Sequence, residues 1–231
     1  MKKYGWKLIL IVILALIVSI YLLKAPLFSS YLTSKMGVRV LLESIDIGES
    51  KTKIKNFHIN NPKGFKREAA FKVKETEINY NFHHLFRDPI EFDLITLDGV
   101  YLNIQVTDLK NGISNWTNIG FNENKTEDVH NKKVIIHKLV LTNISVEVSG
   151  LGSVTGLTVP KKQHFDRWEF NEISSEHGFP TKDLIAKIFG QAGVWTYVKG
   201  IFKQAVKTPK TLNPLRLFGI SEEMNHTEQS P

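Results

Sequence analysis

Two segments of the chain carry the same pattern of apolar residues at a constant offset of 44 positions, as from Ile95 to Leu139. A truncated third copy precedes the first by 38 positions, as from Ile54 to Phe92. Repetition of this kind indicates one structural unit used more than once. The matching positions are Phe92, Ile95, Leu97, Val100, Leu102 and Ile104 in the first full copy, and Ile136, Leu139, Leu141, Ile144, Val146 and Val148 in the second.

Each full copy ends in strict alternation, which predicts strands with one apolar face and one face in water. The side chains expected to face water between Val100 and Val106 include Tyr101, Asn103 and Gln105. An apolar sheet face must be covered by another sheet, a helix, a membrane or a lipid. The sequence therefore predicts a twisted, mostly antiparallel β-sheet of repeating strand units, with strands over residues 38–42, 44–47, 53–60, 71–82, 90–106, 134–148 and 153–159.

Residues 8–23 form an uncharged run near the N-terminus. A membrane-spanning helix needs about 20 residues, and counting from Tyr4 to Leu23 supplies that length, with interfacial side chains at both ends. A cleaved signal peptide would need a small-x-small site after the run, but bulky and charged residues stand there. We therefore expect an uncleaved transmembrane helix, anchored by Trp6, Lys7, Leu8, Leu23 and Lys24.

The charge on either side of this helix predicts its orientation. Lys2, Lys3 and Lys7 keep the N-terminus in the cytoplasm by the positive-inside rule, so the rest of the chain is exported. The expected organisation is an α+β protein. Residues 1–24 form the cytoplasmic N-terminus and anchor, 25–37 a juxtamembrane helix between Pro26 and Gly37, 38–160 the β-rich domain, 161–217 a helical C-terminal region, and 218–231 a disordered tail.

The C-terminal region is expected to contain an amphipathic helix. Apolar side chains recur there at three- and four-residue steps over residues 184–206. The same region is strongly basic, with seven Lys or Arg residues against Asp183 between residues 181 and 217. Such a helix could cover the apolar sheet face, or it could contact anionic lipid or a partner protein. The candidate contact residues are Phe189, Trp195, Lys199, Phe202 and Lys203.

The sequence offers no catalytic constellation. There is no cysteine, which excludes disulfides and thiolate chemistry. The pair His83-His84 lies in a predicted connection between strands, where a solvated turn is the favoured interpretation over a metal site. The acidic residues on strands suit a water-facing surface, so we expect no enzyme, no metal and no cofactor. The basic pI of 9.4 would suit nucleic acid, but an exported, anchored chain meets lipid headgroups first.

The chain resembles the AsmA-like family of bacterial envelope proteins, in particular its short members. The most specific element is Asn61-Pro62-Lys63-Gly64-Phe65, which follows the Ile54, Phe57, Ile59 strand. The remaining elements occur in the expected order: Ala70 to Val73, Leu85-Phe86, Ile95 to Val100, Ser114-Asn115-Trp116, Val134 to Leu139, and Gly156 to Pro160.

The resemblance implies a bacterial inner-membrane protein with a periplasmic β-rich domain, related to proteins that conduct lipid along a β groove. It implies no catalytic residues. A strand of ten residues spans only about 33 Å, so a chain this short does not bridge an envelope alone.

Two functions of different classes follow. The first is lipid binding or passage in envelope maintenance, on an apolar face that includes Val100, Leu102, Ile104, Ile144, Val146 and Val148. The second is a non-enzymatic adaptor that docks an envelope protein through the C-terminal helix or an open sheet edge. Membrane lipids are the expected partners and nucleic acid is not; the sequence does not fix the oligomeric state.

Overall fold

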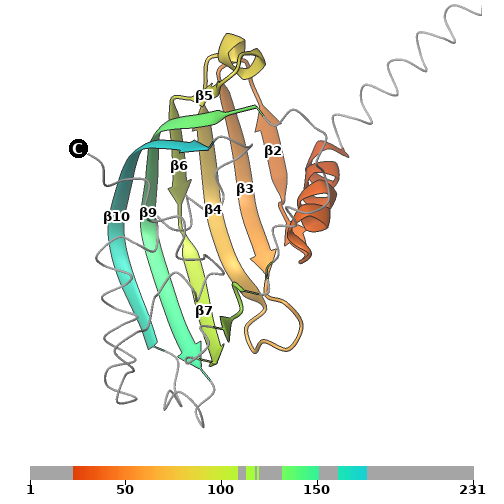
Figure 1. Ribbon diagram of the computed structural model, residues 1–231, viewed down its shortest axis with the longest axis vertical. Coiled ribbons are helices and arrows are strands. Elements are labelled where there is room, and N and C mark those ends of the chain that lie inside the picture. Colours follow the sequence, from red (N-terminus) through yellow and green to blue (C-terminus); the bar gives the residue numbers. More distant parts are fainter. Residues whose placement is uncertain (1–22, 109–112, 118, 120–131, 151–160, 176–231) are drawn as a thin grey trace, which may run out of the picture.

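The computed structural model describes residues 23–108, 113–117, 119, 132–150 and 161–175. All ten described strands belong to one sheet, and a helix over residues 23–36 lies beside one edge of it (Figure 1). The strands are β1 (Val40–Leu41), β2 (Ser44–Ile47), β3 (Lys51–Asn60), β4 (Ala69–Asn79), β5 (Ile90–Phe92), β6 (Leu94–Asp98), β7 (Tyr101–Asp108), β8 (Ile113–Ser114), β9 (Val134–Gly150) and β10 (Lys161–Ser175).

The sheet is mostly antiparallel, as the sequence predicts, but its two full repeats pair in parallel. The strand order is β1-β3-β4-β6-β9-β7-β8, with β2 beside β3, β5 beside β9, and β10 beside β9. β5, β6 and β7 all run parallel to β9, with Phe92 opposite Ile136, Leu97 opposite Leu141 and Leu102 opposite Val146. The offset of 44 between the repeats is therefore also the register between the strands that carry them.

The predicted single strand over residues 90–106 is divided into β5, β6 and β7. The breaks lie at Asp93 and at Gly99-Val100, but the three pieces keep one register against β9. β4 likewise pairs with β6 and then β7 in one continuous antiparallel register. The three pieces thus act as one interrupted strand in the middle of the sheet.

Residues with positive φ form a line across the sheet at the second of these breaks. Asn56 in β3 has φ +49°, Gly99 has φ +67°, and Asn143 in β9 has φ +52°. The registers place Asn56 opposite Lys74, Lys74 opposite Gly99, and Gly99 opposite Asn143. Gly and Asn are the residues that adopt this left-handed conformation at least cost.

This line explains the three-residue steps in the repeat. A left-handed residue interrupts the two-residue alternation of a strand, so Leu141 and Ile144 are both buried although they lie three positions apart. Leu97 and Val100 show the same step beside Gly99, and so do Ile54 and Phe57 beside Asn56. One apolar surface therefore continues through the break, and the buried core includes residues on both sides of it.

The other break crosses the sheet at Asp93, where only Glu172 of the described residues has a positive φ. The registers place Asp93 beside His137 of β9, which lies opposite Glu172 of β10, a residue with φ +50°. The apolar residues again step by three, from Ile136 to Leu139 and from Phe170 to Ile173. Figure 1 shows the start of β9 and the end of β10 turning across the end of the sheet. The sheet is therefore curved as well as twisted.

The helix over residues 23–36 agrees with the juxtamembrane helix expected from the sequence. Gly37 has φ +68° and its N–H donates to the carbonyl of Thr33, which is the left-handed cap that ends a helix. Ala25 packs with Ile45 and Ile54, and the Ser29 hydroxyl donates to the carbonyl of Val40. The helix thus covers the sheet at the edge formed by β1, β2 and β3.

The expected boundary at residue 160, between the β-rich domain and a helical C-terminal region, is wrong. Residues 161–175 were assigned to a helical region, but they form β10, which pairs along its length with β9. The apolar side chains Phe165, Trp168, Phe170 and Ile173 step by three, two and three, so their spacing resembles a helix although they lie on a bent strand. The strand expected over residues 153–159 and the helix expected over 184–206 lie outside the described residues.

No helix in the described part of the chain has the length and hydropathy of a membrane span. The predicted transmembrane run over residues 8–23 lies outside the described residues except for Leu23, and so do Trp6, Lys7 and Leu8.

Replacing Gly99 by Ala tests the line of left-handed residues. A Cβ at Gly99 would lie 2.8 Å from the Cβ of Lys74, whereas Gly37 has nearly the same φ and nothing within 4 Å. We expect Gly99→Ala to lower the free energy of unfolding by about 1–3 kcal/mol, measured by urea denaturation, and Gly37→Ala to lower it less. Equal losses would show that the close approach to Lys74 does not matter.

Candidate functional site

The six residues expected to face lipid lie together on adjacent strands. Leu102 of β7 is opposite Val146 of β9, and Ile104 is opposite Val148. The N–H of Ser145 donates to the carbonyl of Val100 at 2.8 Å, which places Ile144 beside Val100. All six side chains are at most 3% exposed, and all belong to the main apolar cluster: Val100, Leu102, Ile104, Ile144, Val146 and Val148.

The apolar surface extends beyond these six residues in rows across the sheet. One row runs from Ile59 in β3 through Phe71 in β4 to Leu102 and Val146. The next includes Phe57 and Val73, and Phe165 of β10 lies opposite Ile144. Because adjacent strands are about 4.8 Å apart, a row from β3 to β10 is about 19 Å wide.

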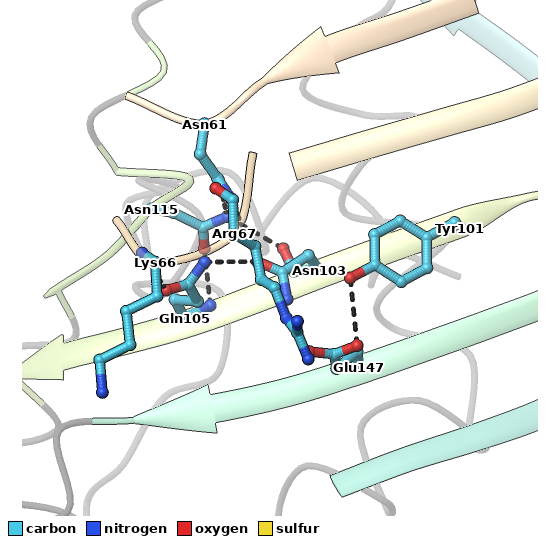
Figure 2. Close-up of polar contacts among 8 residues, drawn as sticks. All are labelled: Asn61, Lys66, Arg67, Tyr101, Asn103, Gln105, Asn115 and Glu147. Carbon is cyan, nitrogen blue, oxygen red and sulfur yellow. Dashed lines mark hydrogen bonds and ion pairs between the residues drawn. The ribbon is translucent and has the colours of Figure 1, made fainter. Parts of the chain in front are cut away.

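The opposite face of β7 is also buried, by a polar network that the sequence did not predict (Figure 2). Asn103 is fully buried and Gln105 is 6% exposed, so the expectation that both face water is wrong. The loop between β3 and β4 lies over them: Asn61 Nδ2 donates to Asn103 Oδ1 at 3.2 Å, and the Lys66 N–H donates to Gln105 Oε1 at 3.0 Å. Gln105 Nε2 also donates to Asn103 Oδ1, at 2.8 Å.

Asn115 closes the edge of β7 where β4 no longer pairs with it. Its side-chain Oδ1 accepts from the Gln105 N–H at 2.8 Å, and its Nδ2 donates to the Asn103 carbonyl at 3.0 Å. The side-chain amide therefore takes the place of a backbone peptide in the ladder. Trp116 Nε1 donates to the same carbonyl at 2.8 Å, and Asn115 Nδ2 also reaches Asn61 Oδ1 at 2.6 Å. An edge satisfied in this way is protected from pairing with another chain.

Glu147 supplies the charge of this network. Its side chain is 9% exposed and accepts from Arg67 Nε at 2.6 Å and from the Tyr101 hydroxyl at 3.2 Å. Arg67 belongs to the loop over the sheet, so the ion pair ties that loop to β9. Burial and the nearby Glu147 carboxylate raise the pKa of Tyr101 to about 12, which keeps its hydroxyl protonated as a donor. The hydrogen bond to Glu147 also raises the pKa of Arg67.

A comparison with known protein families identifies the family to which these features belong. The family model described as the AsmA family matches residues 1–153. The chain belongs to the AsmA family. No curated protein and no solved structure matches it.

The AsmA-family match covers the repeats, the loop between β3 and β4, and the edge cap at Asn115. Asn61 and Asn115, from the two motifs that carry the resemblance, bond directly to one another. The motif around Asn61 forms the loop and the motif around Asn115 forms the edge cap, and the two meet over β7. The match ends before β10, which adds a further strand to the sheet.

The histidines form no metal site in the described part of the chain, where no group of three or more His, Cys, Asp or Glu residues could hold an ion. His83 and His84 lie in a 3-10 turn, η1 (Phe82–Phe86), between β4 and β5, as the sequence predicts for a connection. His137 bridges two acids, with Nδ1 3.1 Å from Glu172 and Nε2 3.5 Å from Glu91. Its hydrogen bond to Glu172 raises its pKa, which is the behaviour of a structural ion pair.

Of the other predicted site residues, Leu23 and Lys24 are the first described residues of the helix over 23–36, and Lys24 Nζ is 3.8 Å from Asp46 Oδ1. The residues Phe189, Trp195, Lys199, Phe202 and Lys203 lie outside the described residues, so their contact with lipid or protein stays a prediction.

Replacing Asn115 by Ala tests the edge cap. The change removes the partner of the Gln105 N–H and one partner of the Asn103 carbonyl, both buried, and should lower the free energy of unfolding by about 1–3 kcal/mol. It should also speed hydrogen exchange of the Gln105 amide, measured by mass spectrometry or NMR. The matched control is Asn171→Ala, at an exposed Asn of β10. Unchanged exchange at Gln105 would contradict the assignment of Asn115 as a strand substitute.

Proposed function

We propose that this AsmA-family chain is a membrane-anchored envelope protein whose periplasmic sheet binds or passes lipid on its apolar face. The observation that carries the proposal is the continuous apolar surface of a single curved sheet, built from Leu102, Val146 and their neighbours. The proposal concerns binding and passage only, because the residues on this face are hydrocarbon side chains with no group to perform a reaction.

The single-layered arrangement of the described strands supports this function. All ten lie in one sheet, so among the described strands there is no second sheet to pack on the apolar face. The helix over residues 23–36 packs on the β1–β3 edge through contacts such as Ala25 with Ile54, and its Leu32 and Met36 join the margin of the main apolar cluster. Because its six central side chains are at most 3% exposed, the proposal requires this face to open before a hydrocarbon chain can lie on it.

The left-handed residues Asn56, Gly99, Asn143 and Glu172 support it as well. They hold the apolar positions of every repeat on one face, at the cost of placing Asn56, Asn143 and Glu172 in a disfavoured conformation. The Asn side chains bond to acids nearby: Asn56 donates to Glu43, which lies between β1 and β2, and Asn143 donates to Asp98 of β6. A sheet that bends with its apolar face intact keeps one continuous apolar surface, which the proposal assigns to an extended hydrocarbon chain.

The polar network on the other face restricts lipid to one side. Glu147, Asn103 and Gln105 occupy that face of β7 and β9 and are bonded to the loop that carries Arg67. Displacing this loop would leave a buried carboxylate unpaired, which is costly. The proposed path for lipid therefore follows the apolar face alone.

A second candidate function is that of an adaptor that docks an envelope protein. It is favoured by β10, a strand of 15 residues that pairs only with β9 among the described strands. Extended edges can accept a strand from a partner.

Site-specific photo-crosslinking tests both candidates in the full chain. Benzoylphenylalanine in place of Phe71, a half-buried aromatic residue on the apolar face, should give phospholipid adducts in bacterial membranes. The same group at Lys72, the exposed neighbour that points to the other face, should give none. Protein adducts from Asn171 of β10, with no lipid adduct from Phe71, would instead support the adaptor.

A further inference from the structure

Most of the exposed apolar side chains of the described residues lie on the helix along the β1–β3 edge and at the end of the sheet formed by β2 and η1. Eight large apolar side chains are exposed among these residues, and seven of them lie on the helix over 23–36 or on the adjoining strand end and turn. Singly scattered exposed residues are normal, but a concentration of them marks an interaction surface. The seven are Leu23, Leu27, Phe28 and Tyr31 on the helix, Ile47 at the end of β2, and Phe82 and Phe86 in η1.

We call the set Leu23, Leu27, Ile47, Phe82 and Phe86 the apolar end. These five side chains are 48–68% exposed, with Phe82 the least and Phe86 the most exposed. The rings of Phe82 and Phe86 are in edge-to-face contact, with centroids 5.1 Å apart. They therefore form a joined aromatic surface on a turn that has no buried residue of its own.

Direct contacts connect the parts of the apolar end to one another. Lys24, next to Leu23, reaches Asp46, next to Ile47, at 3.8 Å. The turn after Ile47 is held by the Tyr80 hydroxyl, which donates to the Gly48 carbonyl at 2.7 Å. Tyr80 leads directly into Asn81, whose side chain caps η1. The packing of Ala25 against Ile45 and Ile54 places the helix beside β2, and the Tyr80 contact places the turn after β2 beside η1.

The register of the sheet places the eighth exposed residue, Ile113, at the opposite end. Ile113 pairs with Asp108 at the end of β7, whereas η1 precedes β5 at the other end of the same line of strands. From Leu94, opposite Asn79, to Asp108 is 14 residues, or about 46 Å at 3.3 Å per residue. The two ends are therefore far enough apart to be distinguished by a probe of membrane depth.

We propose that the apolar end inserts into the interfacial layer of the bilayer that holds the N-terminal anchor. This rests on the anchor in the proposed function, but not on lipid binding by the sheet. The bilayer is the expected partner of this surface, because the uncharged run over residues 8–23 ends at Leu23, the first residue of the apolar end. A surface tethered directly to a span, with Leu and Phe beside Lys24 and Arg87, has the composition of an interfacial segment.

The chain has no cysteine, so single cysteines can be labelled without removing others. The full chain is reconstituted in vesicles of phosphatidylethanolamine and phosphatidylglycerol, with an NBD fluorophore at Leu27→Cys, Phe86→Cys or Ile113→Cys. Lipids with a nitroxide near the headgroup should quench the emission at 27 and 86 and leave that at 113 unchanged. Because Leu27, Phe86 and Ile113 are all exposed, the substitutions remove little packing.

A fourth label at Ala15→Cys, within the uncharged run, separates this inference from the proposed anchor. Quenching at 15 by deep nitroxides, with none at 27 and 86, would overturn the docking of the apolar end and leave the anchor standing. Absence of quenching at all three would overturn both. Labels at 27 and 86 that are shielded from aqueous iodide but not quenched by lipid would place a protein on this surface and would also overturn the inference.

Discussion

The line of left-handed residues through Asn56, Gly99 and Asn143 is the constraint on which the rest of the structure depends. A regular strand turns every second side chain to the same face, and the apolar residues of this chain step by three at each break. Only because adjacent strands break in register do these residues remain on one surface. The continuous core of the sheet follows from that alignment, and the line through Asp93, His137 and Glu172 adds the curvature.

The two faces are stabilised by different physics. Burial of aliphatic side chains such as Ile104 and Ile144 holds the apolar face, at about 25 cal/mol for each Å² removed from water. The other face depends on hydrogen bonds whose buried members are costly to leave unpaired. Asn115 illustrates the second kind, since one side chain completes a strand edge and also binds the loop through Asn61. The family motifs therefore have a structural reason that is independent of any ligand.

The sequence revealed local features well and remote contacts poorly. Alternation in Val100, Leu102 and Ile104 predicted the strands and the apolar face, because the period of a strand is a local property. It could not predict that the polar residues between them are buried, because the loop that covers them lies about 40 positions away. The repeat offset of 44 was visible, but the sequence alone did not show that it is the register of a parallel pair. β10 was missed because its apolar residues step by three at the breaks, as in a helix.

Lipid binding by the apolar face can be measured on the purified protein. The most direct measurement is quantitative mass spectrometry of the lipids that purify with the full chain from bacterial membranes, compared with a folded variant carrying Leu102→Asn and Val146→Asn. Both proteins keep the same N-terminal run, so lipid bound around an anchor cancels in the comparison. We expect an excess of phospholipid on the native chain that the variant loses. Equal lipid content in the two proteins, with the variant's sheet intact by circular dichroism, would contradict it.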